Sequence, residues 1–270
     1  MAVYAIGDVH GCLKSLDALL ETLPSKAKYL FIGDTINRGP QTLDTIRRIM
    51  DLGDRADAVL GNHELHLLGV YAGVRKMNPR DTINQILDAP DCDDIIDWIR
   101  SKPLAIEKKG FLCVHAATHW SWSLSDSLAY SREVEKVLQA DDWKDNIGHL
   151  FGKDQWNEEA TGWDRLRGIA NVFTRTRYLN SDGTMEYSAK LSPKDTDPAL
   201  IPWFKYPGRK TEDVPVVFGH WSTLGPVEWK NIYSLDTACI WGGRLTAVKL
   251  KEPAETVSVK APLYLTPKAD

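Results

Sequence analysis

The stretch VYAIGDVHG, residues 3–11, has a form that recurs twice before residue 65. An apolar run ends in a glycine and a polar residue, and a helical pattern of apolar residues follows. The second copy begins with YLFIGD at residues 29–34, and the third with AVLGNHE at residues 58–64. Strand, short turn and helix in this order predict parallel strands joined by crossover helices, as in α/β proteins. Ligands of such sheets bind at the carboxyl ends of the strands, where the polar residues of all three copies lie.

Apolar patterns predict further elements after these three units. Helical spacing runs over residues 80–102 and near Arg132–Gln139. The segment of about residues 120–170, rich in Trp, Asp and Glu, is predicted to be a helical cap inserted over the site. The tail of about residues 252–270 carries prolines and lysines and is expected to be poorly ordered. Strands are predicted at residues 111–114, 172–178, 216–218, 232–235 and 245–249, the last two in a second sheet.

Length and composition restrict the class of protein. With 270 residues, 43% of them hydrophobic and 26% charged, the chain is predicted to form a single large globular domain. The net charge of −4 argues against nucleic acid as the main partner, because proteins that bind it are normally basic. No apolar run is long enough to span a membrane, and the first residues do not resemble a secretory signal. Four cysteines without a CxxC pair are typical of reduced thiols, so a cytoplasmic location is expected; the oligomeric state stays open.

Six residues with metal-binding side chains lie at the ends of predicted strands. Two carboxylates, one amide and three imidazoles form a mixed set of oxygen and nitrogen donors that suits Mn²⁺ or Co²⁺, with Fe²⁺, Zn²⁺ and Mg²⁺ as alternatives. Six protein ligands are too many for one catalytic ion with an open position, so we expect two divalent ions that share a bridging carboxylate. Taken singly, each residue could instead cap a helix, stabilise a turn or pack in the core. The six are Asp8, His10, Asp34, Asn62, His115 and His220.

Three segments resemble the signature blocks of the phosphoprotein-phosphatase superfamily of calcineurin-like metallophosphoesterases: GDVHG at residues 7–11, GDTINRG at 33–39 and GNHE at 61–64. His115 and His220 resemble two later histidine ligands of that superfamily. The resemblance implies a four-layer α+β fold, in which a central β-sandwich of mixed sheets is flanked by helices. It also implies that Asp8 and His10 bind the first metal, that Asp34 bridges both, and that the second is bound by Asn62, His115 and His220.

The same resemblance assigns roles around the metals. His63 would protonate the leaving group, and Arg38 would clamp a phosphate oxygen with its planar fork of donors. A surface salt bridge is the alternative for Arg38. One position departs from the superfamily, because its protein phosphatases carry Asp where this chain has Asn37. The amide brings no charge to His63, which fits a leaving group that needs little acid help, such as a nucleoside diphosphate.

Two later segments are similar to those of the bacterial symmetrical diadenosine tetraphosphatases: FTRTR at residues 173–177 and LDTACIWGG at 235–243. The family's reaction would be attack of a metal-activated hydroxide on an inner phosphorus of diadenosine tetraphosphate, giving two ADP. On a strand, Arg175 and Arg177 would share one face and could hold phosphates, or could form a solvated edge. Trp221 and Trp241 could stack on adenine, although core packing is the more ordinary role of such residues.

Three other activities compete with this assignment. A protein serine/threonine phosphatase would use the same centre with a different leaving group, but Asn37 and the LDTACIWGG segment count against it. An asymmetric enzyme would release ATP and AMP, and only the resemblance disfavours it. A catalytically inactive dinucleotide sensor would usually have lost a ligand or the acid, whereas all six ligand candidates and His63 are present.

Overall fold

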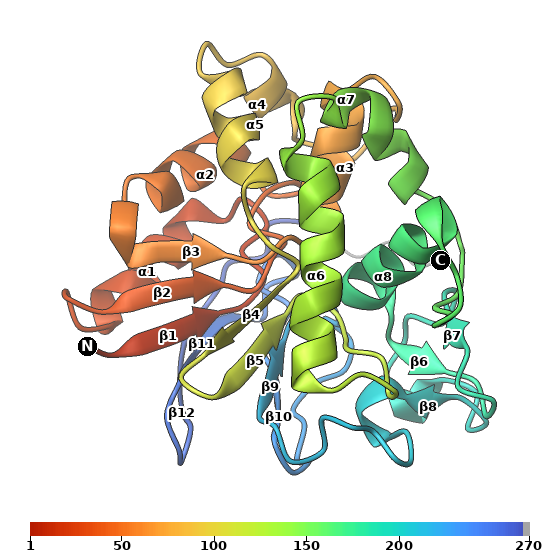
Figure 1. The fold of residues 1–270 in the computed structure, drawn as a ribbon. Helices are drawn as coiled ribbons and strands as arrows, with labels where there is room; N and C mark the ends of the chain where they lie inside the picture. The colour runs from red at the N-terminus through yellow and green to blue at the C-terminus, as the bar shows by residue number, and fades with distance from the viewer. Residues whose placement is uncertain (267–270) are drawn as a thin grey trace.

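The computed structural model describes residues 1–266 and has two sheets at its centre (Figure 1). In the first sheet the order is β12-β11-β1-β2-β3, and in the second it is β10-β9-β5-β4. A small third sheet has the order β7-β6-β8. The strands are β1 (Val3–Ile6), β2 (Lys28–Phe31), β3 (Ala56–Ala58), β4 (Ala105–Lys108), β5 (Phe111–Val114), β6 (Tyr178–Leu179), β7 (Met185–Glu186), β8 (Ile201–Pro202), β9 (Val216–Phe218), β10 (Ile232–Ser234), β11 (Arg244–Lys249) and β12 (Glu255–Lys260).

Both large sheets are mixed, as the sequence predicts. Strands β1, β2 and β3 are parallel, while β11 pairs antiparallel with β1 and with β12. In the second sheet β5, β9 and β10 are parallel, and β4 is antiparallel to β5. The parallel strands of each sheet therefore end at one edge, and this edge carries the polar residues of the site.

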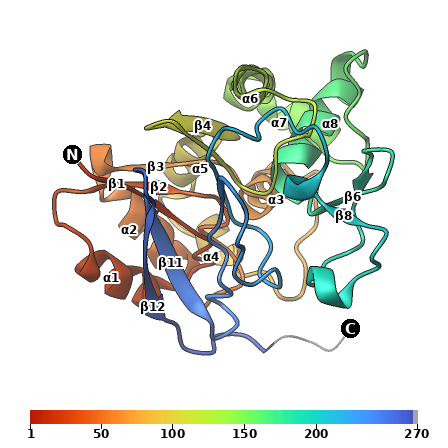
Figure 2. The same ribbon diagram turned by 90° about the horizontal axis from the view of Figure 1, so that it is seen from below.

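Helices cover the outer faces of the two sheets. Helices α1 and α2 lie on one side of the molecule, and α6 and α8 lie on the other (Figure 2). The helices are α1 (Leu13–Thr22), α2 (Thr42–Met50), α3 (Asn62–Tyr71), α4 (Asn84–Leu87), α5 (Cys92–Arg100), α6 (Leu124–Gln139), α7 (Trp143–Asn146) and α8 (Gly162–Arg175), with short 3₁₀ turns η1 (Gly53–Arg55), η2 (Ile147–Leu150), η3 (Pro193–Asp195) and η4 (Trp203–Lys205).

The hydrophobic core is divided among three clusters that match these layers. One lies between the sheets and joins Ala5 and Leu30 of the first sheet to Cys113 and Val217 of the second. A second packs α1 and neighbouring residues on the outer face of the first sheet. The third joins α3, α5, α6 and α8 to the second sheet. Apolar residues on both faces of each sheet explain why the short strands read as continuous apolar runs.

Two expectations about individual elements are wrong. Residues 172–175 belong to α8 and only Tyr178–Leu179 forms a strand, because Ile169, Val172 and Phe173 follow helical spacing into the core. Strand β11 lies in the first sheet beside β1, not in the sheet of β10.

In the tail, where poor order was expected, residues 255–260 form β12, whose backbone pairs with β11 along its whole length. The last part of that expectation, residues 267–270, lies outside the described residues. Within residues 1–266, no helix combines the length and the apolar character needed to cross a membrane.

Candidate metal centre and substrate cavity

All six predicted donors converge at the edge between the two sheets. They leave β1, β2, β5 and β9 or begin α3, so the convergence follows from the way the sheets pack. His10, Asp34 and His220 have positive φ angles of 50°, 47° and 66°. Non-glycine residues seldom adopt this left-handed conformation, which here lets the chain reverse sharply while the side chain turns to the site.

The carboxylate of Asp34 lies at the middle of the cluster. Its Oδ2 atom is 3.8 Å from Nε2 of His10 and 3.4 Å from Nε2 of His115. Two groups of donors share this residue, one formed by His10, Asp34 and His63 and the other by Asp34, His115 and His220. Separations of this size exceed ordinary hydrogen bonds but suit ligands around a cation with bonds of about 2.0–2.2 Å. Asp34 thus has the position needed to bridge two ions.

His115 and Asn62 show that these donors suit a cation. Nδ1 of His115 lies 2.8 Å from the carbonyl oxygen of Ile32, to which it can only donate. In the neutral ring Nε2 then offers a lone pair, and it faces Asn62 Oδ1 at 3.1 Å and Asp34 Oδ2 at 3.4 Å. Although burial opposes it, the neighbouring Asp34 carboxylate raises the pKa of His115, so a proton on Nε2 can satisfy both oxygens in the metal-free protein, and a bound cation would take the place of that proton. The backbone carbonyl therefore orients His115 as a metal ligand requires.

The charges of Asp8 and His220 favour a cation as well. Burial, followed by the nearby carboxylates of Asp236 and Asp34, raises the pKa of Asp8 well above its usual value. Burial and the positive charge of Arg177 lower the pKa of His220 well below its usual value. Nε2 of His220 is buried and has no hydrogen-bond partner within residues 1–266. A crowded carboxylate and an unpartnered, unprotonated imidazole nitrogen are both stabilised by a bound metal ion.

Glu64 fixes the backbone around Asp34. Its carboxylate accepts hydrogen bonds from the backbone N–H groups of Asp34, Thr35 and Gly61 at 2.8–2.9 Å and from the Thr35 hydroxyl at 2.8 Å. The N–H of His63 donates to Oδ1 of Asp34 at 2.9 Å, which leaves Oδ2 free. At position 61 a Cβ atom would lie 2.2 Å from Oδ1 of Asp34, so only glycine fits.

His63 and Arg38 lie beside this centre. Nε2 of His63 is 3.8 Å from Oδ2 of Asp34, and burial lowers the pKa of His63 to about 3 despite the attraction of that carboxylate. Nδ1 of His63 lies 2.8 Å from the amide nitrogen of Asn37. Asn37 therefore contacts His63, although it lacks the negative charge of the Asp that protein phosphatases of the superfamily carry at this position. Asn37 and Arg38 have φ angles of 73° and 72°, a strained turn that brings both side chains toward the site.

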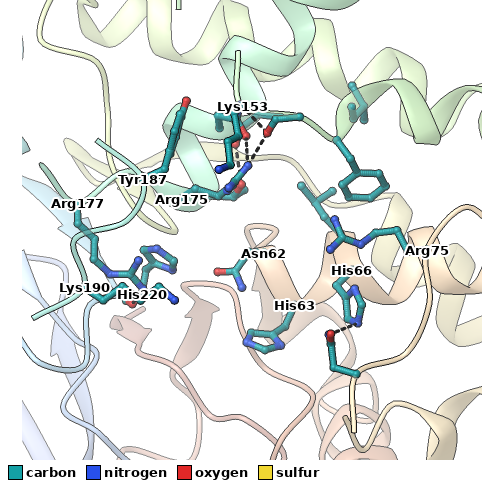
Figure 3. Close-up of a pocket in the computed structure, with 18 of the residues that line it drawn as sticks. Asn62, His63, His66, Arg75, Lys153, Arg175, Arg177, Tyr187, Lys190 and His220 are labelled. Carbon is teal, nitrogen blue, oxygen red and sulfur yellow. Dashed lines mark hydrogen bonds between the residues drawn. The ribbon is translucent and has the colours of Figure 1, made fainter. Parts of the chain in front are cut away.

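A cavity of about 640 Å³ opens onto Asn62, His63 and His220 (Figure 3). None of the described residues that line it is acidic. Two aromatic rings contact its cations, since the Arg75 guanidinium lies 4.6 Å from the ring centre of Phe151 and that of Arg175 lies 4.9 Å from Tyr187. Such a cavity suits an extended anion with an aromatic end. Its six basic residues are Arg38, Arg75, Lys153, Arg175, Arg177 and Lys190.

Arg175 and Arg177 both line this cavity, but not for the expected reason. They are not neighbours on one face of a strand, because Arg175 ends α8 and Arg177 follows in extended chain. Arg175 donates to the carbonyl of Gly152 at 2.5 Å, and Arg177 donates to that of His220 at 3.0 Å. These backbone contacts hold both guanidinium groups at the cavity wall.

A second, smaller cavity of about 290 Å³ includes His10, Asp34 and His220 of the candidate metal centre in its wall. It shares Arg38, His63 and Arg177 with the larger one and is also lined by Asp236 and Trp241. Trp241 therefore stays a candidate for contact with substrate.

Trp221 is not accessible to a nucleobase. It is 1% exposed, lies 4.6 Å from the ring of Tyr178, and donates from its indole nitrogen to the Leu191 carbonyl. Stacking of Trp221 on adenine is therefore ruled out by its place in the core.

Several residues of the site were missed from the sequence. Arg75, Lys153 and the pair Tyr187 and Lys190 come from three different loops, and no periodic pattern connects them. The cluster of Arg75, Lys76 and Arg80 was a visible signal of a basic loop. Asp81, which accepts a hydrogen bond from Asn37 at 3.0 Å, was not singled out.

The fold and the candidate donors fit a metal-dependent phosphoesterase, and comparison with known proteins agrees. Residues 1–221 match the family model described as calcineurin-like phosphoesterase. A crystal structure provisionally described as a diadenosine tetraphosphatase has a TM-score of 0.61 at 21% identity, covering 96% of this chain and 93% of that one. This likeness and the family match confirm the predicted fold class.

Two curated relatives are more specific. "Bis(5'-nucleosyl)-tetraphosphatase, symmetrical" from Janthinobacterium sp. (strain Marseille) is 44% identical over 272 residues, which cover 99% of each chain. The protein of the same description from Ralstonia nicotianae is 46% identical over 251 residues, 92% of this chain and 88% of the relative. The chain belongs to the calcineurin-like phosphoesterases and, within them, to the family of symmetrical bis(5'-nucleosyl)-tetraphosphatases.

The contacts of Glu64 predict an effect on metal affinity. In Glu64→Gln the side-chain NH₂ would face one of the backbone N–H groups that now donate to Glu64, so Asp34 would lose its fixed position. We expect the affinity for Mn²⁺ to fall about 10- to 100-fold, the usual effect of losing a residue that orients a metal ligand. Calorimetric titration of the metal-free protein would measure it. Glu135→Gln, on α6 away from the centre, is the matched control and should bind Mn²⁺ normally; equal affinity of both variants would contradict the prediction.

Proposed function

We propose that this protein hydrolyses diadenosine tetraphosphate, with one molecule of water, to two molecules of ADP. Two divalent cations would be held by the six converging donors. The single observation that carries the proposal is the carboxylate of Asp34, shared by two groups of donors. Asp8 and His10 would complete one site with Asp34, and Asn62, His115 and His220 would complete the other. Bound there, such ions lower the pKa of water and withdraw charge from phosphoryl oxygens.

The substrate is supported by family membership and by the large cavity. The relatives named as symmetrical tetraphosphatases align over almost the whole chain, including the basic residues of α8. Six cations without an acidic neighbour in the cavity wall match a chain of phosphates, although the net charge of the protein is −4. The two cavities adjoin at Asn62, His63 and His220, so each could receive one nucleoside diphosphate half of the substrate.

Three side chains would act directly on the phosphates. His63 faces the centre through Nε2 and would donate a hydrogen bond to the leaving oxygen. Arg38 lines both cavities and would bind an oxygen of the phosphate under attack. Arg175 would bind another phosphate of the substrate, further from the one under attack. Phe151 and Lys153, which follow η2, form part of the same wall, so we assign residues 120–170 the role of a cap.

We further propose Mn²⁺ or Co²⁺ as the metals, on the mixture of oxygen and imidazole donors without thiolate. A cytoplasmic location is proposed for the protein, supported by four cysteines that are all free and buried.

The reaction products test the proposal. With Mn²⁺, diadenosine tetraphosphate should give ADP as the only nucleotide product, and a chelator should stop the reaction. Anion-exchange chromatography separates ADP from ATP and AMP. Release of ATP and AMP would show asymmetric cleavage, and release of phosphate from a phosphoserine peptide at a comparable rate would point to a protein phosphatase.

His63→Ala should reduce turnover by about 10²- to 10⁴-fold, the usual contribution of a residue that donates a proton or hydrogen bond in the transition state. Metal affinity should be unchanged, because the donors of both proposed sites remain. Steady-state rates together with metal titration would measure the two effects. His149→Ala is the control, since His149 stacks on Trp163 at 4.6 Å and does not line the cavity; normal turnover of His63→Ala would exclude His63 from the reaction.

Arg175→Ala should lower kcat/KM for diadenosine tetraphosphate by about 10- to 100-fold, because a hydrogen bond to a charged group contributes about 1.5–3 kcal/mol. The comparison variant is Arg165→Ala, which removes a guanidinium of the same helix that pairs with Glu133 and lies outside the cavity lining. Arg165→Ala should retain its kcat/KM even if its stability falls. Similar values for both variants would remove Arg175 from the phosphate site.

A further inference from the structure

The side chain of Asn37 is held in one orientation. Its Oδ1 atom accepts hydrogen bonds from the backbone N–H of Arg38 at 2.8 Å and from that of Thr82 at 2.9 Å. Both backbone groups can only donate, so the atom that they contact must be the amide oxygen. The amide nitrogen consequently points the other way, and the residue is fully buried.

The nitrogen of this amide determines which nitrogen of His63 carries a proton. Nδ2 of Asn37 lies 3.0 Å from Oδ1 of Asp81 and 2.8 Å from Nδ1 of His63. An amide NH₂ has two protons and cannot accept a hydrogen bond. One proton is therefore donated to Asp81 and the other to His63. Since Nδ1 of His63 accepts, the proton of the neutral ring must be on Nε2, the nitrogen that faces Asp34 and both cavities.

Asp81 is itself held in position against the amide of Asn37. Its Oδ2 atom lies 2.7 Å from Nε2 of His66 and accepts from the backbone N–H of Asn78 at 2.6 Å. The guanidinium of Arg38 approaches Oδ1 at 3.6 Å, and the carboxylate is fully buried. With partners on both oxygens, Asp81 cannot turn away from Asn37. The acidic group that the sequence lacks at position 37 is thus present one residue further out, with the amide between it and His63.

We propose that Asn37, held by Asp81, is a positioning residue that makes Nδ1 of His63 an acceptor, keeps the ring proton on Nε2 and so restricts the protein to phosphoanhydrides. This inference rests on the proposed function and adds the basis of its leaving-group specificity. Asp81 acts through Asn37 and does not touch the substrate.

The chemistry follows from the donor that this network leaves at the site. As hydroxide forms its bond to phosphorus, the P–O bond of the anhydride breaks and its electron pair stays on the departing nucleoside diphosphate. That oxygen remains anionic and accepts a hydrogen bond from Nε2 of His63, which keeps its proton. A neutral imidazole can stabilise charge in this way without transferring a proton. An alkoxide from a serine ester is far more basic and needs a full proton, which an imidazolium supplies much more readily.

Exchanging the two side chains tests the proposal. In the double variant Asn37→Asp/Asp81→Asn, the carboxylate at position 37 can still accept from Arg38 and Thr82, and can also accept from a protonated Nδ1 of His63. The amide at position 81 can donate to it, so every hydrogen bond in the network keeps a donor and an acceptor. Each single variant instead brings two carboxylates or two amides together, so the single variants should lose more activity and stability than the double variant.

Two measurements separate this role from a merely structural one. The first is the ratio of kcat/KM for an alkyl phosphate monoester to that for diadenosine tetraphosphate, both with the same metal. The exchange should raise this ratio about tenfold or more, since a proton donor of sufficient strength contributes about 10²- to 10⁴-fold. The second is the ¹⁵N spectrum of the histidine rings in protein loaded with diamagnetic Mg²⁺, with the His63 signals assigned from their loss in His63→Ala.

In the unmodified protein Nδ1 of His63 should be unprotonated and Nε2 protonated, and in the exchanged variant Nδ1 should carry a proton. A proton on Nδ1 in the unmodified protein would overturn the proposal. So would an unchanged ratio in an exchanged variant that folds and has the altered spectrum. If the exchanged variant fails to fold, the spectrum of the unmodified protein still decides. Absence of diadenosine tetraphosphate hydrolysis would instead contradict the proposed function, because the spectrum does not depend on it.

Discussion

The free oxygen of the Asp34 carboxylate is the point on which the site depends. Glu64 holds the backbone on either side of Asp34, and the N–H of His63 occupies one carboxylate oxygen. The other oxygen is left to face imidazoles from both sheets. A buried carboxylate this close to several ligand side chains is stable only with compensating positive charge. The close packing of the two sheets therefore gathers buried carboxylate and imidazole groups that a bound cation would stabilise.

Charge is distributed very unevenly around that centre. The protein as a whole has a net charge of −4, and its centre contains the carboxylates of Asp8, Asp34 and Asp236. The described lining of the large cavity by contrast has six Arg or Lys residues and no acidic residue. A cleft lined by one sign of charge concentrates the field within it, so a polyphosphate can be attracted locally to an acidic protein. Net charge alone would have missed this property.

His63 differs from the histidines of the candidate metal centre in how a carboxylate reaches its Nδ1 side. At the candidate metal centre the Asp34 carboxylate lies 3.4–3.8 Å from His10 and His115 with nothing between them, whereas the carboxylate of Asp81 reaches His63 only through a neutral amide. This indirect contact orients the ring without adding a charge to it. The hydrogen bonds join three segments of the chain, near Asn37, His63 and Asp81, so the turn after β2, the start of α3 and the loop before α4 form one unit.

The sequence by itself determined the three βα units and the candidate donors, because each of these is encoded within a few consecutive residues at a strand end. The mixed two-sheet fold followed only from the family resemblance of those segments. The sequence misjudged residues 172–175, whose β-branched and aromatic side chains suit a strand, while their packing with Ile169 on the second sheet favours a helix. Only the tertiary structure decided the membership of β11, the basic cavity and the contact of Asp81 with Asn37, 44 residues apart. Such contacts join side chains that are distant in the chain, and neither periodicity nor local turn chemistry can encode them.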